Sequence, residues 1–389
     1  MKNSTFIIAE IGTAHGGNFE KAVELMDAAI EAGADAVKFQ WVYADEILHP
    51  NTGFVELPGG KVRLYDRFKA LEVKSEFFKK CSDYARSKNV KFICSPFGLK
   101  SLEELLKIEP DYVKIASPEL NHFPLLKALA EYRGEQKKNG KKSVPVIISS
   151  GVSELKDIQN AIDILGTEQI TLLHCITFYP APEDEYNLRV IKTLSKKFGI
   201  GCGVSDHSLD SVLVPCLAVS QGAKMIEKHI TLSKETDGLD DPVALTAEQF
   251  GFMCHTVHQS DAVLRHYGTE KGEMEIIRQM GETYGKERVE KILGSGKKEL
   301  APSEKQNYGR TNRSLHFIND MKAGEKIKNG DVAVLRTEKV LTPGISPKFL
   351  EEITGVRTFS VRKTATSPFF IFSPAFMSFI KCRLRFVRP

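Results

Sequence analysis

Two lysines and four serines occupy positions where short apolar segments of the chain, predicted to be buried strands, come to an end. Lys38 and Lys114 lie within the segments AVKFQ and YVKIA. The hydroxyl groups belong to Ser95, Ser117, Ser149 and Ser205. Two ammonium groups that converge on one cavity with several hydroxyls would bind a phosphorylated, doubly anionic ligand. The alternatives are a lysine that extends from a strand edge to solvent and a Schiff base at Lys114.

Two histidines close two consecutive segments of the same kind. His207 follows GVSD, and His229 ends IEKH. Two neutral imidazoles with additional oxygen ligands suit a divalent metal that keeps coordination positions open. The alternative is that His207 makes only a hydrogen bond in a tight turn. The neighbouring carboxylates Asp206 and Glu227 are candidates to hold the imidazoles from behind through hydrogen bonds.

Two further carboxylates, Glu10 and Glu119, follow other predicted strands. Because the carboxyl ends of parallel strands meet at one edge, we expect both carboxylates at the same rim as the lysines and histidines. They are candidates for proton transfer or for hydrogen bonds with substrate hydroxyls.

The elements that position these residues follow a repeating order. Eight apolar segments alternate with stretches of helical periodicity, and they span residues 6–10, 36–40, 91–95, 112–116, 144–149, 170–174, 200–205 and 224–229. Strands that are apolar on both faces and are separated by helices predict a parallel sheet closed into a (β/α)8 TIM barrel. An open doubly wound sheet is the alternative. In a barrel, the reactive groups lie at the carboxyl ends of the strands.

The rest of the chain predicts a second, smaller domain. Residues 1–268 form the expected barrel domain, and 269–306 are highly charged and are interpreted as a linker with two helical pieces. Residues 307–364 contain short strands and glycine turns, which predict a small β-rich domain. Residues 365–389 form an atypical tail whose apolar part, 369–380, is too short and too interrupted by proline to span a bilayer.

Composition narrows the class of function. The 389 residues include 54 Lys and Arg against 50 Asp and Glu, for a formal net charge of +4, so we expect no nucleic-acid partner. Seven scattered cysteines without a CxxC pair predict reduced thiols and a cytoplasmic protein. No signal peptide is expected at the N-terminus. The absence of GxGxxG and GKS/GKT motifs argues against dinucleotide and P-loop sites.

An ordered series of motifs resembles the sialic acid synthase family, which includes N-acetylneuraminate synthases and relatives that make legionaminic, pseudaminic and spore-coat sugar acids. The motifs are IAEIGTAHGGN, GADAVKFQ, FICSPF, YVKIASPELNHFPLL, IISSG, LLHCITFYPAPEDEYNL, GVSDHS, IEKHIT and NRSL. The resemblance extends from about residue 5 to residue 363. It implies that the small domain is an antifreeze-like (SAF) domain.

The resemblance also implies an activity and a role for each matched residue. The family condenses phosphoenolpyruvate with the aldehyde of an N-acetylated hexosamine, N-acetylmannosamine or a diacetamido analogue, to a nine-carbon 2-keto sugar acid, with Mn²⁺ or Mg²⁺ as cofactor. The metal ligands match His207 and His229. The phosphoenolpyruvate contacts match Lys38, Ser95, Lys114, Ser117, Ser149 and Ser205. The sugar contacts match Glu10, Gln40, Tyr179 and Asp240.

Two further matches concern the reacting carbons and the partner subunit. Glu119 matches the carboxylate beside the reacting carbons. Arg336 in AVLRT matches an arginine that the small domain delivers to the sugar site of the partner subunit, which implies a domain-swapped homodimer.

Some positions depart from the family pattern, and they leave other functions open. Ala14 precedes His15 where the family has Asn, Gly59 and Gly60 occupy a loop that carries a sugar-binding Asn, and Thr177 replaces another Asn. These changes leave the identity of the sugar undetermined. The alternatives are a phosphoenolpyruvate-dependent synthase that uses a phosphorylated aldose, and a catalytically silent carbohydrate-binding homologue.

Overall fold

The computed structural model describes residues 4–57, 60–235, 238 and 240–358 of the chain. The predicted tail at 365–389 and the last residues of the predicted small domain lie outside these ranges, and so does Gly59.

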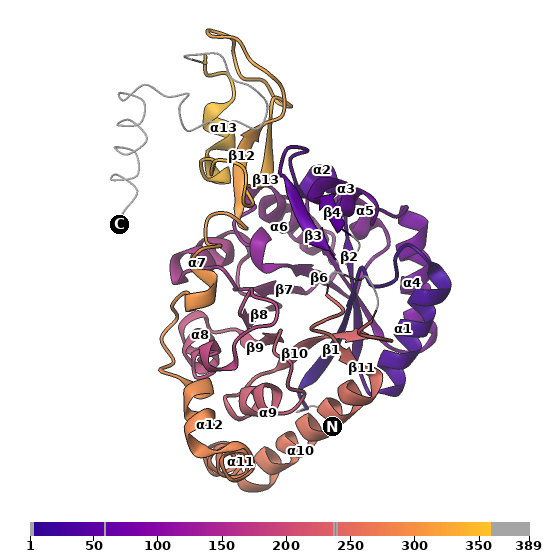
Figure 1. Ribbon diagram of the computed structural model, residues 1–389, viewed down its shortest axis with the longest axis vertical. Coiled ribbons are helices and arrows are strands. Elements are labelled where there is room, and N and C mark those ends of the chain that lie inside the picture. The colour runs from indigo at the N-terminus through magenta and orange to yellow at the C-terminus, as the bar shows by residue number, and fades with distance from the viewer. Residues whose placement is uncertain (1–3, 58–59, 236–237, 239, 359–389) are drawn as a thin grey trace.

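Eight parallel strands form a closed barrel (Figure 1). They are β1 Phe6–Gly12, β2 Ala36–Trp41, β5 Lys91–Pro96, β6 Tyr112–Ile115, β7 Val146–Ser149, β8 Ile170–Cys175, β9 Gly201–Asp206 and β10 Met225–Thr231. Strand β1 pairs with β2 on one side and with β10 on the other, which closes the ring. The predicted barrel is therefore confirmed, and the open doubly wound sheet is excluded.

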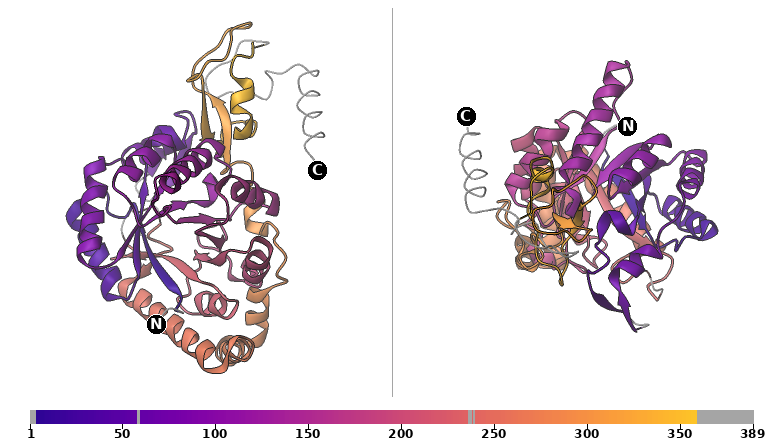
Figure 2. Two further views of the ribbon diagram at one scale, coloured as in Figure 1. Left: turned by 180° about the vertical axis from the view of Figure 1, so that it is seen from behind. Right: turned by 90° about the horizontal axis from the view of Figure 1, so that it is seen from above.

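Helices surround this ring and cover the outer face of the strands (Figures 1 and 2). They are α1 Phe19–Glu31, α4 Ser75–Ser87, α5 Leu99–Lys107, α6 Phe123–Lys138, α7 Leu155–Leu165, α8 Val190–Phe198, α9 Leu213–Ser220 and α10 Ala247–Tyr267. Helix α1 shows why they form: Asn18 caps it by accepting a hydrogen bond from the amide of Lys21, and its buried residues Ala22, Leu25, Met26 and Ala29 recur every three or four positions.

The predicted charged linker differs from the observed structure, because its helices belong to the shell of the barrel. Residues Thr269–Tyr284 form α11 and Lys286–Leu293 form α12. Val289, Ile292 and Leu293 are buried in the same apolar core as the outer face of the strands. The charges that suggested a linker lie on the solvent-facing side of amphipathic helices.

Shorter elements lie in the long connection after β2 and between the later strands. Helices α2 Ala44–Ile47 and α3 Leu64–Lys69 flank a hairpin formed by β3 Phe54–Leu57 and β4 Gly60–Arg63. Strand β11 Leu245–Thr246 extends the sheet beside β10. The 3-10 helices are η1 Ser117–Glu119, η2 Glu183–Glu185, η3 Pro302–Glu304 and η4 Pro347–Phe349.

The C-terminal part of the described chain forms a small module at the edge of the barrel (Figure 2). Strands β12 Arg313–Phe317 and β13 Val332–Arg336 pair antiparallel, and the short helix α13 Leu350–Ile353 packs nearby. The module has its own apolar core, formed by Leu315, Phe317, Met321, Ile327, Val332, Ile345 and Ile353. A separate small β-sheet is thus present, and its assignment to the antifreeze-like class stays a prediction.

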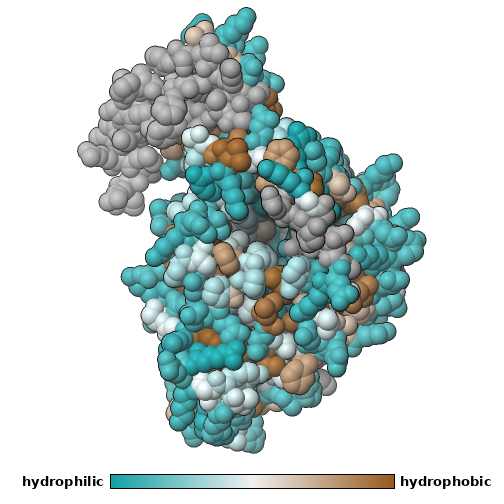
Figure 3. Space-filling view, in the orientation of Figure 1, coloured by the Kyte–Doolittle hydropathy of each residue, from teal (hydrophilic) through white to brown (hydrophobic). Residues whose placement is uncertain are grey.

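The surface of the protein is mostly polar. The face in Figure 3 is largely hydrophilic, and its hydrophobic residues form small separate groups. None of the helices in the described ranges combines the length and the apolar character that crossing a bilayer requires.

Candidate active site

The predicted site residues are gathered by the two-residue alternation of the barrel strands. One layer of apolar side chains fills the barrel interior below the cleft. It consists of Ile8, Ala36, Ile93, Ile147, Leu173 and Met225. Because successive side chains point to opposite faces, the residues two positions further along each strand also face inward. These are Glu10, Lys38, Ser95, Ser149, Cys175 and Glu227. The polar residues therefore form a second layer, at the carboxyl ends of the strands.

A cleft of about 440 Å³ opens above this layer. All the site residues proposed from the sequence line it except Ser95, Glu119 and Asp206. Ser95 lies behind Lys38, with 3.5 Å between Lys38 Nζ and Ser95 Oγ. The opposite wall of the cleft is apolar and consists of Val42, Leu64, Phe68, Leu71 and Phe97.

The two lysines converge on one carboxylate, as the sequence predicted. Lys114 Nζ lies 2.6 Å from Glu227 Oε2, and Lys38 Nζ lies 3.7 Å from Glu227 Oε1. Lys38 also pairs with Glu10 Oε2 at 2.6 Å. Burial by itself would raise the pKa of Glu227, but the two ammonium groups lower it to about 2. Glu227 therefore stays ionised and holds both lysines at the floor of the cleft.

Hydroxyl groups complete this cationic half of the cleft. Ser205 Oγ donates to Glu227 Oε1 at 3.0 Å, and Ser117 Oγ accepts from the amide of Gly151 at 3.0 Å. Ser149 Oγ is buried and has no hydrogen-bond partner in the part of the chain that the structure describes. Buried hydroxyls are normally paired, so an oxygen of a ligand would satisfy Ser149.

The two histidines face each other across the cleft, with 5.7 Å between ring centroids. His207 Nδ1 lies 2.8 Å from the carbonyl oxygen of Ile176, and its Nε2 lies 3.2 Å from the hydroxyl of Tyr179. A carbonyl accepts but cannot donate, so Nδ1 carries a proton. His229 Nδ1 lies 3.9 Å from Asp240 Oδ2. This arrangement turns the Nε2 edge of His207 toward the cleft.

The protonation of the two imidazoles differs because their neighbours differ. Burial lowers the pKa of His229, so its imidazole is neutral at pH 7. Burial also disfavours a charged His207, but its contact with Cys175, 3.7 Å from Sγ to Nδ1, outweighs burial and raises the pKa of His207 to about 9. A cation that binds His207 through Nε2 would displace the proton from that nitrogen, while Nδ1 keeps its proton toward the carbonyl of Ile176.

The two imidazoles supply only part of the coordination shell of a divalent cation. In residues 4–57, 60–235, 238 and 240–358, no three His, Cys, Asp or Glu side chains form a group that could hold a metal ion. Two facing imidazoles with the Asp240 carboxylate nearby are therefore what the described chain offers, and substrate oxygens and water would complete the coordination.

The structure corrects the expected partners of the histidines. Neither Asp206 nor Glu227 is hydrogen-bonded to an imidazole. Asp206 accepts from the hydroxyl of Tyr186 and from Lys228 Nζ, both at 2.6 Å. The same Tyr186 hydroxyl accepts from the amide of His207 at 2.7 Å. Asp206 thus fixes the backbone of His207 through Tyr186.

Glu119 is also placed differently from the expectation. Its Oε1 accepts from Arg313 Nη2 at 2.9 Å and from Arg336 Nη2 at 2.8 Å, and the carboxylate is fully buried. Arg313 is itself buried and donates to the carbonyl oxygen of Phe97 at 2.8 Å. Glu119 Oε1 therefore anchors two guanidinium groups, while its Oε2 is buried without a hydrogen-bond partner in the described chain, and its assignment to the reacting carbons stays a prediction.

Arg336 reaches the cleft from β13 of the same chain. Its backbone forms a bridge with Leu48, and its guanidinium lines the cleft beside Tyr179 and Glu338. The contact with Glu119 is therefore made within one chain, whereas the resemblance implies delivery to a partner subunit. The sequence analysis missed Arg313, although the motif NRSL contains it.

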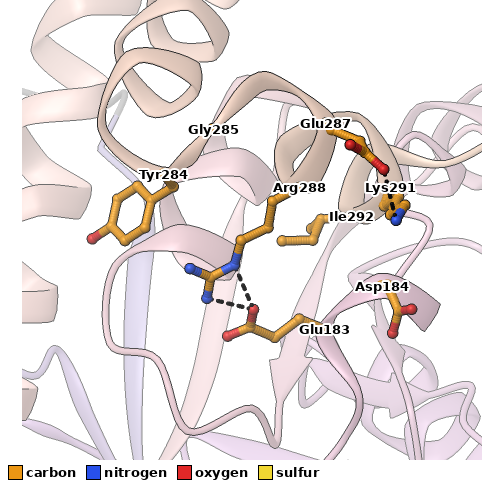
Figure 4. A pocket seen from close by; sticks show the side chains of 8 residues that line it. All are labelled: Glu183, Asp184, Tyr284, Gly285, Glu287, Arg288, Lys291 and Ile292. Atoms are coloured by element: carbon orange, nitrogen blue, oxygen red, sulfur yellow. Dashed lines mark hydrogen bonds and ion pairs between the residues drawn. The ribbon is translucent and has the colours of Figure 1, made fainter.

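A second pocket, of about 570 Å³, lies outside the barrel between η2 and α12 (Figure 4). Arg288 points to Glu183, 2.7 Å from Nη2 to Oε2, and Lys291 pairs with Glu287 at 3.0 Å. Both cationic groups that line it are paired with carboxylates, so the pocket at the barrel mouth is the better candidate for an active site.

The fold and the cleft define the class of protein: a (β/α)8 barrel that carries two buried lysines and two facing imidazoles at the carboxyl ends of its strands. The NeuB family matches residues 25–268, and the chain belongs to this family. It is 34% identical over 358 residues to the spore coat polysaccharide biosynthesis protein SpsE of Bacillus subtilis, covering 90% of this chain and 89% of SpsE.

Two more comparisons agree with this assignment. The N,N'-diacetyllegionaminic acid synthase of Legionella pneumophila is 30% identical over 363 residues, which covers 90% of each chain. The crystal structure of SpsE from Bacillus subtilis superposes with a TM-score of 0.75 and 32% identity, covering 94% of each chain. The similarity therefore extends beyond the barrel.

Proposed function

We propose that this protein is a sialic-acid-type synthase that joins phosphoenolpyruvate to the open-chain aldehyde of an N-acetylated hexosamine. The methylene carbon of phosphoenolpyruvate forms a bond to the aldehyde carbon, whose oxygen takes up a proton. The hydroxyl of a water molecule adds to the neighbouring carbon, and phosphate leaves with the former enol oxygen. The product is a nine-carbon 2-keto sugar acid. The names of the relatives, which are synthases of sugar acids of this type, support the proposal.

The observation that carries the proposal is the pair of buried lysines in the cleft. Each ammonium group has three N–H donors. Lys114 donates to Glu227, and Lys38 donates to Glu10 and Ser95, so donors remain on both lysines for phosphate oxygens. The buried hydroxyl of Ser149 supplies another contact. In such a water-poor site, fixed positive charges stabilise the negative charge that grows on the departing phosphate.

We further propose that His207 and His229 hold a divalent cation, Mn²⁺ or Mg²⁺. When bound, the cation supplies Lewis-acid polarisation of the aldehyde oxygen. The carbonyl of Ile176 orients the His207 ring for this task, as outer-shell hydrogen bonds do at metal sites generally.

The other half of the cleft suits an acetamido sugar. Tyr179, Gln40 and Asp240 present hydrogen-bonding groups, while the apolar wall formed by Val42, Leu64, Phe68, Leu71 and Phe97 can receive methyl groups. This combination suits the acetamido methyl groups of N-acetylmannosamine or a diacetamido analogue.

Phosphate release tests the proposal directly. We expect the metal-loaded protein to release phosphate from phosphoenolpyruvate only when N-acetylmannosamine or a diacetamido hexose is present. Sugar-dependent release should stop when a chelator removes the cation and return when Mn²⁺ is added. Release with a phosphorylated aldose alone would favour the alternative synthase, and sugar binding without any release would favour a catalytically silent homologue.

Arg336→Ala should raise the KM for the sugar by about tenfold to a hundredfold, while the KM for phosphoenolpyruvate changes little. Arg336 lies on the sugar side of the cleft, and its removal leaves the lysines untouched. Initial rates measured as a function of each substrate separate the two constants. An equal rise in both would contradict the assignment.

Co-expression of two variants tests whether Arg336 acts in the cleft of its own chain or in that of a partner subunit. Lys114→Met damages the barrel and Arg336→Ala raises the sugar KM, so neither variant alone should be appreciably active at a sugar concentration well below the wild-type KM. If the proposed homodimer exchanges its modules, co-expression of the two variants yields dimers with one intact site, and activity returns. A co-expressed mixture that stays inactive assigns Arg336 to the cleft of its own chain, as in the structure.

A further inference from the structure

The loop that follows β7 has an unusual backbone. Val152 adopts φ +41°, in the left-handed region that a β-branched residue rarely occupies. Such a conformation persists only when the surroundings hold it in place. The loop begins directly after Ser149, whose buried hydroxyl faces the proposed phosphate site.

The groups that hold Val152 come from the segment between the barrel helices and β12. Glu304 Oε1 accepts from the amide of Val152 at 2.7 Å, and Asn312 Nδ2 donates to the carbonyl oxygen of Val152 at 3.0 Å. Both peptide groups of the strained residue are therefore bound by residues about 150 positions away in the chain. Lys298 Nζ also donates to the carbonyl oxygen of Ser150 at 3.0 Å.

Glu304 also binds the loop that follows β8. The same Oε1 accepts from the amide of Thr177 at 2.7 Å, and the Glu304 side chain is completely buried. A carboxylate with no access to water is stable only when it is well hydrogen-bonded. Glu304 thus joins two loops whose neighbouring residues, Ser149 and Tyr179, line the cleft.

The β7 loop that Glu304 holds also contacts the loop after β6. The amide of Gly151 donates to Ser117 Oγ at 3.0 Å. There is no room for a side chain here, because a Cβ on Gly151 would lie 2.0 Å from Thr177 Oγ1 and 2.9 Å from Ser117 Oγ. A shift of the β7 loop would therefore displace Ser117 and Ser149 together.

We propose that Glu304 and Asn312 are positioning residues that hold the loops after β6, β7 and β8 in the shape required for the phosphate-bearing substrate. This inference rests on the proposed function of the cleft. Neither residue carries the chemistry, and Glu304 does not line the cleft. The segment that leads to the C-terminal module is therefore an integral part of the phosphoenolpyruvate half of the site.

Glu304→Ala tests the inference, with phosphoenolpyruvate binding measured by calorimetry and turnover measured by phosphate release. Loss of two buried hydrogen bonds to a charged acceptor should weaken phosphoenolpyruvate binding by about tenfold or more. The KM for the sugar should change less, by no more than about threefold, because Glu304 reaches the sugar side only through the amide of Thr177, two residues before Tyr179. Asn312→Ala should act in the same direction, by about threefold to tenfold.

The conservative variant Glu304→Gln separates positioning from the need for a charge. Both loop amides donate to Oε1, so the carbonyl oxygen of a glutamine can keep both bonds, and binding should recover to within about threefold of the wild type. Glu299→Ala is the matched control: this carboxylate lies in the same segment, is exposed and pairs with Lys297. It should leave both substrates unaffected.

The outcomes distinguish this inference from the function on which it rests. A wild type that binds no phosphoenolpyruvate would overturn the proposed function. A wild type that binds it, with Glu304→Ala and Asn312→Ala binding equally well, would overturn the positioning role alone. Equal losses for both substrates would show a merely structural role. Should Glu304→Ala fail to fold, Asn312→Ala and Glu304→Gln still decide the question.

Discussion

Lys114→Met should reduce kcat/KM for phosphoenolpyruvate by about a thousandfold or more, as expected when a preorganised charge is removed from a transition state. The Lys114 ammonium is buried at the floor of the cleft, 2.6 Å from Glu227. Methionine keeps the length of the side chain but supplies no charge and no N–H donor. One of the two cations proposed to hold the phosphate is then lost.

The same variant should also be less stable, which requires a control. Removing one member of a buried ion pair leaves an uncompensated charge and typically costs about 3–5 kcal/mol. The double variant Lys114→Met with Glu227→Gln removes both charges, so thermal denaturation should show most of the stability restored. Its activity should remain absent. Recovery of activity in the double variant would refute the phosphate-binding role.

The Schiff-base alternative for Lys114 predicts a different result. Borohydride reduction in the presence of substrate would then attach the substrate covalently to Lys114, and mass spectrometry would detect the added mass. Under the proposed function, no such adduct forms.

His229→Ala should abolish cation binding and turnover together, with kcat reduced by about a thousandfold or more. The imidazole of His229 is neutral at pH 7 because burial lowers its pKa, and it faces His207 across 5.7 Å. One imidazole is insufficient to hold a divalent cation in an otherwise open site. Calorimetric titration with Mn²⁺ reads out cation binding independently of activity.

His258→Ala is a suitable control for this variant, because His258 is exposed on α10, away from the strand ends. It should bind Mn²⁺ and turn over like the wild type. Phosphoenolpyruvate should still bind to His229→Ala within a few-fold, since the lysines are intact. Full metal-dependent turnover in His229→Ala would show that the ligand assignment is wrong.

The barrel and the inner polar layer could be predicted from the sequence because both depend on local periodicity. Apolar segments separated by helical stretches define the strands, and the alternation of side chains places Lys38 two residues after Ala36 on the same inward face. Closure of the ring then brings Lys38 and Lys114 together without any further information. The meeting of the two lysines at Glu227 confirms this prediction.

The packing of the predicted charged linker could not be predicted from the sequence for a related reason. The charge density of residues 269–306 was visible, but the burial of Val289 and Ile292 against the barrel was not. Amphipathic helices and solvated linkers share a high content of charged residues, and only packing against a partner surface distinguishes them.

The sequence by itself determined the barrel and the polar residues at the carboxyl ends of its strands. It also determined which residue types are present there to bind an anionic substrate or a divalent cation. Tertiary structure alone decided which of these groups pair: Glu227 with the lysines rather than with a histidine, and Glu119 with Arg313, 194 residues away. It also decided that Glu304 holds loops from the middle of the chain. Periodicity fixes the face on which a side chain lies, but the identity of a distant partner depends on how whole elements pack together.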